Sequence, residues 1–182
     1  MKRTATKQAT TKRLTAREKS EKGSDAAPQP ATVEIERYNK LVAATELLGL
    51  QLIRSKADLF PERLPDDGDL VLRVKSPQFR GEYVDESRTL SCGVRLTLVL
   101  EPATAKDSSV LEVFAEYNVT YRLRDSAECA ADIAHLFAGR NAVFNVWPFF
   151  RELAFSLVAK MGMPPLVLPL FRMPLLPKVG AH

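Results

Sequence analysis

Few residues in this sequence could do covalent or acid–base chemistry, and none of them falls in a recognisable motif. The chain has two histidines, His135 and His182, and two cysteines, Cys92 and Cys129. A catalytic triad would have to rest on His135, and the cysteines lack the C-x-x-C spacing of a zinc or redox site. There is no G-x-G-x-x-G, Walker-type or H-E-x-x-H motif. The sequence therefore predicts a protein that is not an enzyme and that uses no metal or cofactor.

The residues that could carry a function are apolar and aromatic, in places where a core does not need them. Residues 164–176 hold eight large apolar side chains among prolines, which keep the chain extended and remove backbone donors. Extended apolar surface outside a core marks a binding site, although the same segment could simply staple the domain edge. Three aromatic residues near expected strand ends complete the candidate set. The predicted polypeptide-binding residues are Phe60, Phe79, Tyr83, Leu166, Leu168, Leu170 and Phe171.

A long helix over Val143 to Met161 must position that segment. Apolar residues cover most of its circumference, Pro148 fits its first turn, and Gly162 stands where a C-terminal cap is expected. One sheet face cannot bury all the apolar surface of a helix whose side chains are apolar around most of its circumference. The helix is either sunk inside a large core or packed against another subunit as well. The residues predicted for a subunit interface are Trp147, Phe150, Leu153, Ala154, Leu157 and Val158.

The rest of the chain predicts the sheet that this helix covers. Residues 50–59, 70–75, 90–100 and 110–123 alternate between apolar and polar side chains, which is typical of an antiparallel sheet with one wet face. Helical periodicity is found over residues 33–48 and 126–138, with Gly49 and Gly139 as stop signals. Strands followed by helices indicate an α+β fold, here a four-stranded antiparallel sheet with helices packed on one face.

One stretch adds a family resemblance to this pattern. It has the aromatic-Pro-aromatic triplet Trp147-Pro148-Phe149, then Arg151-Glu152 and Lys160, and finally Gly162, Pro164, Leu166 and Leu168. This series resembles the bacterial export chaperone SecB, and its doubled proline is similar to divergent SecB-like proteins, some of which accompany toxin–antitoxin modules. The motif covers about 25 residues, and the order of expected elements extends the likeness over residues 47–173.

The resemblance implies a function and partners. SecB-like proteins hold unfolded or nascent preproteins without ATP and deliver them to the translocation motor SecA, and their long helix packs between subunits of a homotetramer, a dimer of dimers. Asp58 and Glu62 match the acidic pair that contributes to SecA binding in SecB. The alternative is an adaptor or a toxin–antitoxin-associated chaperone that serves one partner protein. Both alternatives remain open at this point.

The ends of the chain differ in composition from its centre. Residues 1–25 hold eight Lys or Arg against three Asp or Glu, whereas residues 26–182 hold eighteen against nineteen. A basic segment with few large apolar residues predicts a disordered tail over 1–31, able to contact nucleic acid only non-specifically. The predicted domain covers 32–173, followed by a flexible tail at 174–182. No apolar run reaches the ~20 residues of a membrane span, and no apolar segment follows the basic N-terminus, so we expect a bacterial cytoplasmic protein.

Overall fold

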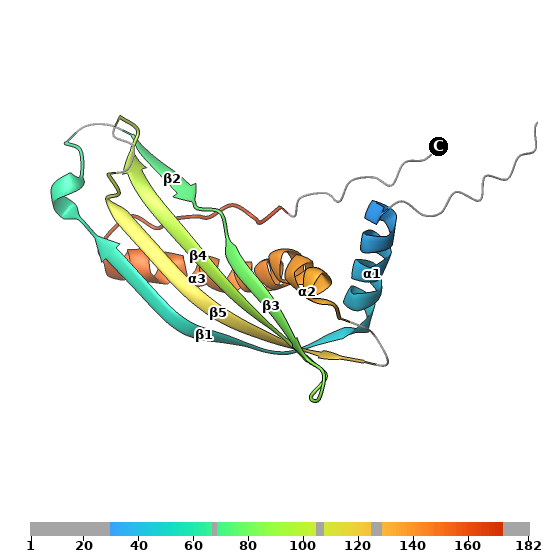
Figure 1. Ribbon diagram of the computed structural model, residues 1–182. Coiled ribbons are helices and arrows are strands. Elements are labelled where there is room, and N and C mark those ends of the chain that lie inside the picture. The colour runs from blue at the N-terminus through green and yellow to red at the C-terminus, as the bar shows by residue number, and fades with distance from the viewer. Residues whose placement is uncertain (1–29, 67–68, 105–107, 125–128, 173–182) are drawn as a thin grey trace, which may run out of the picture.

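The computed structural model describes residues 30–66, 69–104, 108–124 and 129–172 (Figure 1). The tail predicted at 174–182 lies outside these residues, as do all but the last two residues of the tail predicted at 1–31. The first residues of the helix predicted at 126–138 lie outside them too. In chain order the elements are α1 (Pro30–Ala44), β1 (Thr45–Leu59), η1 (Pro61–Arg63), β2 (Leu70–Val74), β3 (Gln78–Val84), β4 (Thr89–Pro102), β5 (Leu111–Leu123), α2 (Ala131–Phe137), η2 (Ala138–Ala142) and α3 (Val143–Lys160).

The strands form one antiparallel sheet in which β1 pairs with β5 and β5 with β4. The far edge of β4 is shared by two strands, since β2 pairs with its second half and β3 with its first. The sheet thus has five strands but is four strands wide. The register places Val94 between Phe79 and Tyr117, and Leu100 between Leu72 and Leu111. The predicted α+β fold is confirmed.

Strand β3 is the element that the sequence analysis missed. The sequence analysis placed residues 76–83 between two strands. In the structure, burial alternates along the whole strand from Gln78 to Val84. Phe79 and Tyr83 are half-buried against the core, while Arg80 is exposed. The alternation typical of a strand was therefore present in the sequence, and its apolar residues face the helices.

Both helices after the sheet lie behind it in Figure 1, so that one face of the sheet is covered and the other is open. Buried and more exposed residues alternate along β5 without a break. On the face that the helices cover, Val113, Ala115 and Val119 are fully buried. Opposite them, α3 buries Val143, Val146, Phe150 and Ala154. Helices packed on one side of a sheet leave the alternate residues of each strand in water, which explains the polar half of the pattern.

The helices α2 and α3 are continuous, which the sequence analysis did not predict. A π-helical turn, η2, joins them, so that one helical run extends from Ala131 to Lys160. Gly139 does not end a helix, and Pro148 lies inside one instead of in its first turn. This run is long and apolar enough to cross a membrane by length and composition, but the core helix of a soluble protein passes the same test, and α3 packs on the sheet.

Two glycines allow β3 to lie very close to the helices. A Cβ atom on Gly81 would stand 2.2 Å from the backbone oxygen of Ala134, on α2. A Cβ atom on Gly139 would stand 2.5 Å from Cζ of Phe79, whose ring also packs against His135 with centroids 4.9 Å apart. Cβ atoms essentially never come this close to another heavy atom. At Gly81 the obstacle is backbone, so glycine is required, whereas at Gly139 a side chain would displace the Phe79 ring. Gly139 is thus a packing residue, which is why it failed as a helix stop.

The first helix ends earlier than predicted. Periodic apolar residues suggested a helix through Leu48, but α1 ends at Ala44 and Thr45 already pairs with Leu123 on β5. Pairing with β5 overrides the local helical pattern here. On α1, Tyr38 and Leu41 are buried, and the Tyr38 hydroxyl donates a hydrogen bond to the side-chain oxygen of Asn141. The helix therefore covers the end of the core beside η2.

Candidate polypeptide-binding site

The C-terminal segment folds back along α3. Gly162 caps the helix with a φ of 76°, as predicted, and its N–H donates to the carbonyl oxygen of Ala159 at 3.1 Å. The chain then runs in the reverse direction, so that Trp147 meets its far end. The indole Nε1 of Trp147 donates to the carbonyl oxygen of Pro169 at 3.0 Å, and its ring lies 5.5 Å from that of Phe171, centroid to centroid.

Side chains of this segment point alternately inward and outward. Leu168 is only 2% exposed, and Leu166 and Phe171 are half-buried against the core. In contrast, Val167 is 78% exposed and Leu170 is 75% exposed. The sequence left open whether this segment binds a ligand or packs on the domain edge, and in the structure each interpretation applies to different residues. Leu168 is a staple and is not available to a ligand, whereas Leu170 is free to contact one.

A shallow hollow of about 280 Å³ separates this segment from α3. Its walls are Pro148, Arg151, Glu152, Phe155, Leu166, Val167 and Leu168. Phe155 and Val167 are largely exposed there, and sequence reasoning did not select either of them individually. The seven-residue spacing of Pro148 and Phe155 was the signal that could have found this wall, because it places both on one helix face. The Arg151 Nε atom is buried and has no hydrogen-bond partner among the described residues.

The three other predicted binding residues do not join this hollow. Phe79 and Tyr83 pack against the core, and Phe79 is held between His135 and Gly139. Phe60 lies beyond β1, where it lines a different hollow with Phe114 and other residues of the open sheet face. The register places Phe60 and Phe79 about seven residues apart along the sheet, or roughly 23 Å. A single groove containing all seven predicted residues does not exist in this protomer.

The residues predicted for a subunit interface face the protomer's own sheet. Trp147, Phe150, Ala154 and Val158 are buried, and Leu153 and Leu157 are half-buried against the core. The sheet of the same protomer takes up the surface of the four buried residues, so only the exposed parts of Leu153 and Leu157 are left for a second subunit. The outward side of α3 carries other aromatic residues, namely Phe144, Phe149 and Phe155.

The acidic pair predicted to contact a translocase is neutralised locally. Lys56 Nζ lies 2.7 Å from Oδ2 of Asp58, and Arg63 Nε lies 3.8 Å from Oε1 of Glu62. The hydrogen bond and charge of Asp58 raise the pKa of Lys56, which keeps the lysine positively charged. Asp58 and Glu62 therefore do not add up to a strong negative field.

Burial makes the thiols and phenols of the core unreactive. Cys92 is fully buried, and burial together with the nearby Cys129 raises the pKa of its thiol to about 12. Burial also raises the pKa of Tyr117 to about 12, with a smaller contribution from Glu152. The thiolate is the nucleophilic form of cysteine, so Cys92 is inert at neutral pH. Among the described residues, no group of three or more His, Cys, Asp or Glu side chains could hold a metal ion.

Comparison with solved structures identifies the fold. The SecB-like chaperone Rv1957 of Mycobacterium tuberculosis, in complex with a ChAD peptide from the Rv1956 HigA1 antitoxin, aligns with a TM-score of 0.61. The alignment covers 77% of this chain and 99% of that one, at 16% sequence identity. This chain has the SecB-like fold. The element order inferred from the sequence is thus the order of a known architecture, an antiparallel sheet followed by a long helix.

The SecB-like fold is visible here in structure and not in overall sequence. No family model matches this chain, and no curated protein matches it significantly. A protein of unknown function from Streptococcus agalactiae aligns with a TM-score of only 0.37 and 11% identity, over 69% of this chain and 96% of that one. That value is too low to indicate a shared fold.

Proposed function

We propose that this protein is an ATP-independent holdase chaperone that binds unfolded or nascent polypeptides in the cytoplasm. The observation that carries the proposal is the exposure of Val167, which lines the hollow along α3, and of Leu170, three residues further along the same segment. Prolines keep this segment extended, so its outward side chains cannot turn into the core. An extended apolar strip next to a hollow fits an extended polypeptide with apolar side chains.

The hollow also offers polar contacts to a client backbone. The Glu152 carboxylate on its wall can accept a hydrogen bond from a client N–H group. Backbone groups are common to all polypeptides, so such contacts add affinity without demanding one sequence. No nucleophile or cofactor takes part in this binding, and we propose no reaction.

Energetics argue for several weak sites acting together. Burying about 200 Å² of apolar surface contributes ~5 kcal/mol at ~25 cal/mol per Å². Association and ordering of the client offset much of that gain, so a single site binds weakly. Linked sites on an oligomer restore affinity, because binding at the second site is effectively intramolecular. The proposed chaperone therefore acts as a homo-oligomer, for which the resemblance to SecB implies a tetramer.

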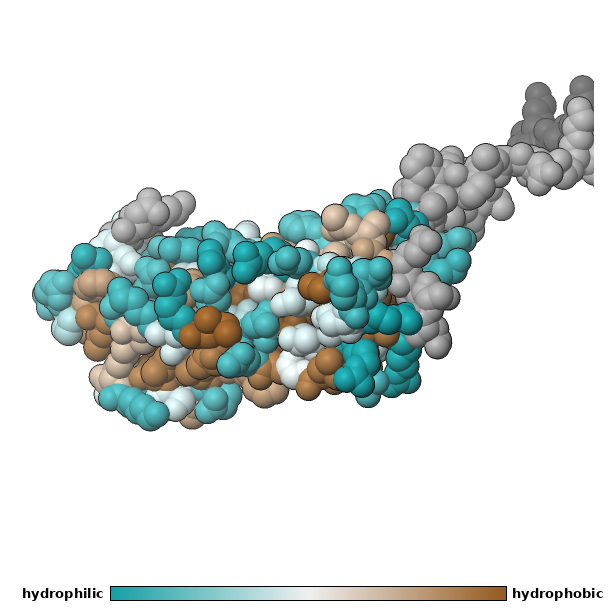
Figure 2. Space-filling model, turned by 60° about the horizontal axis from the view of Figure 1, so that its bottom comes forward, coloured by the Kyte–Doolittle hydropathy of each residue, from teal (hydrophilic) through white to brown (hydrophobic). Residues whose placement is uncertain are grey.

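The edge strand β1 supports the proposed oligomer. It leaves Leu47, Leu48, Leu52 and Ile53 largely exposed. Two bulges, between Leu47 and Gly49 and between Leu52 and Arg54, turn extra residues outward. These four residues are placed symmetrically about Leu50 in the sequence. A two-fold axis at Leu50 would therefore place apolar side chains of one copy opposite apolar side chains of the other. Figure 2 turns the lower edge of Figure 1 forward and shows apolar side chains gathered along it.

A charge on this edge should dissociate the oligomer. For Ile53→Lys we expect a smaller molar mass by light scattering, because a desolvated lysine would face apolar side chains of the partner copy. Val84→Lys is the matched control, since Val84 is an exposed apolar residue on β3. An unchanged mass for Ile53→Lys, or a monomeric wild type, would refute the proposed interface.

Holdase activity is tested directly by aggregation of a reduced, unfolded client without nucleotide. We expect stoichiometric protein to suppress light scattering by the client. Leu170→Asp should weaken affinity for a labelled, permanently unfolded protein about ten-fold, because the carboxylate would be desolvated against apolar client side chains. Its melting temperature should be unchanged, since Leu170 is exposed.

The control for this variant is Leu64→Asp, which changes an exposed leucine after η1, away from the hollow. Equal losses for both variants would mean that the C-terminal segment has no special role. Unchanged client aggregation in the presence of the wild type would remove the holdase function altogether.

Two client classes fit this site, and one observation bears on the second. The first is preproteins for export, with Asp58 and Glu62 as proposed contacts to SecA; their local ion pairs weaken that contact. The second is one dedicated partner, which is supported by the antitoxin peptide bound to the structurally similar Rv1957. Crosslinking in cells, followed by identification of bound proteins, separates many preproteins from one partner.

A further inference from the structure

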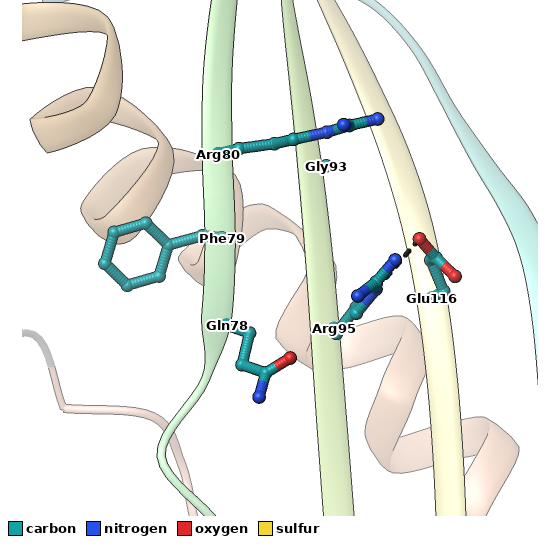
Figure 3. A pocket seen from close by; sticks show the side chains of 6 residues that line it. All are labelled: Gln78, Phe79, Arg80, Gly93, Arg95 and Glu116. Atoms are coloured by element: carbon teal, nitrogen blue, oxygen red, sulfur yellow. Dashed lines mark hydrogen bonds and ion pairs between the residues drawn. The ribbon is translucent and has the colours of Figure 1, made fainter.

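The open face of the sheet carries a hollow that lies outside the site along α3. Gly93 has no side chain, and the gap of about 150 Å³ above it is lined by Gln78, Phe79, Arg80, Arg95 and Glu116 (Figure 3). Strands β3, β4 and β5 supply these residues. A Cβ atom on Gly93 would stand 3.3 Å from the side chain of Arg80, so the glycine lets Arg80 lie across the sheet. Figure 3 shows the Arg80 side chain reaching from β3 across β4 towards β5.

Positive charge exceeds negative charge around this hollow. Glu116 accepts hydrogen bonds from Arg95 Nε at 3.0 Å and from Arg54 Nη2 at 3.4 Å. Arg80 forms no ion pair within the described part of the chain. Three guanidinium groups thus surround one carboxylate, which leaves a local charge of about +2 at neutral pH. The hollow lies between Arg80 and Arg95, so a second carboxylate placed there would meet both.

A second hollow adjoins it on the same face. This one is about 500 Å³ and contains the rings of Phe60 and Phe114, with Arg54 on its border. Glu116 and Phe114 are two residues apart on β5, which corresponds to about 7 Å along the strand. An extended peptide presents alternate side chains at the same spacing. Gly93 lies level with Asn118, four residues or about 13 Å from Phe114 along β5, so an acidic residue over Gly93 would bring the peptide side chain four residues away towards Phe114.

Charges at both ends of the face limit what can bind there. Glu82 lies on β3 at one end. At the other end Glu112 on β5 lies opposite Asp58 on β1, whose charge is balanced by Lys56. A long polyanion such as a nucleic acid would meet these carboxylates on either side of the arginines. A short segment with isolated acidic groups would not. The charge pattern thus favours an acidic polypeptide over a continuous phosphate backbone.

We propose that the open sheet face is a second polypeptide-binding site, which takes a short extended segment combining acidic and large apolar residues. Arg80 and Arg95 bind its carboxylate over Gly93, and the hollow at Phe60 and Phe114 receives its apolar side chain. This site lies on the face of the sheet opposite α3, so it works independently of the proposed holdase site and does not rest on it.

The test uses the full chain and a fluorescein-labelled ten-residue peptide in which aspartate and phenylalanine stand four residues apart, separated by glycine. A matched peptide has lysine in place of aspartate. By fluorescence anisotropy at low salt, we expect the wild type to bind the acidic peptide about ten-fold tighter than the lysine peptide. Arg80→Glu should weaken binding of the acidic peptide about ten-fold, and high salt should reduce the preference.

Two further variants separate a specific site from general attraction. Arg122→Glu changes the net charge by the same amount at the end of the face, and it should alter affinity by less than about two-fold. Gly93→Thr fills the hollow without changing charge, and it should weaken acidic-peptide binding about five-fold. The basic N-terminal residues are common to all variants, so they cannot produce these differences.

Three results would overturn the proposal. The first is unchanged affinity of the acidic peptide for Arg80→Glu, and the second is an equal loss for Arg122→Glu. The third is displacement of the peptide by a ten-nucleotide thymidine oligomer at the same concentration as by unlabelled peptide, which would assign the arginines to nucleic acid. Far-UV circular dichroism checks that each exposed substitution leaves the fold intact.

Discussion

Replacing Gly81 by alanine is expected to destabilise the protein by about 3 kcal/mol or more. The added Cβ would lie 2.2 Å from the carbonyl oxygen of Ala134 and 2.7 Å from its carbonyl carbon. Both are backbone atoms of α2, so no side-chain rotation can relieve the contact. The strand or the helix must move, and the packing of Phe79 against Gly139 would be lost with it. Urea unfolding followed by circular dichroism measures the effect as a lower midpoint.

Gly49→Ala is the matched control for this experiment. Gly49 also lies in a strand, β1, but a Cβ atom added to it would meet no other atom within 4 Å. Alanine at Gly49 should leave the free energy of unfolding within about 1 kcal/mol, or raise it slightly by restricting the unfolded chain. Equal stability of Gly81→Ala and wild type would mean that β3 and α2 do not approach each other this closely.

Phe150→Ala is expected to cost about 3–5 kcal/mol, the usual range for removing a buried phenylalanine. Phe150 is 0% exposed, and its ring packs beside that of Trp147 with centroids 5.9 Å apart. The loss arises within one protomer, so the shift in unfolding midpoint should not depend on protein concentration. A residue at a subunit interface would behave differently, because its contribution scales with subunit association.

The neighbouring Phe149 provides the control, because it is 54% exposed on the outward side of α3. Phe149→Ala should change the free energy of unfolding of the protomer by about 1 kcal/mol or less. Thermal unfolding at two protein concentrations distinguishes the two residues. If Phe149→Ala proved the more damaging change, the orientation of α3 on the sheet would be wrong.

Period-two patterns and caps were predictable because they depend on neighbours in the sequence. The alternation over residues 110–123 corresponds to β5, and the Gly162 cap ends α3 where the sequence placed it. Strand β3 was missed although its alternation was present. Gly81 lies in the middle of this strand. Its true role depends on Ala134, which is more than fifty residues away in the chain. Sequence spacing contains no information about that contact.

The candidate site was only partly predictable. The proline-rich segment was selected correctly as extended and partly exposed, and Leu170 is one of its outward residues. Leu168 is buried, Phe155 was overlooked, and Val167 was included only as part of the segment 164–171. Which side of an extended chain faces outward depends on where α3 lies. The same holds for α3 itself, whose apolar stripe at Phe150 is satisfied by the sheet of its own protomer.

The sequence by itself determined the α+β element order, the wet and dry faces of β4 and β5, and the extended C-terminal segment. These follow from local alternation, from the caps and from proline chemistry, which act over a few residues. Only the tertiary structure decided which apolar residues the core consumes and which remain for a partner. It also brought Arg54 and Arg95 to Glu116 and placed Arg80 across Gly93. The physical reason is that burial and charge clustering depend on strand register and helix placement, which join residues distant in the chain.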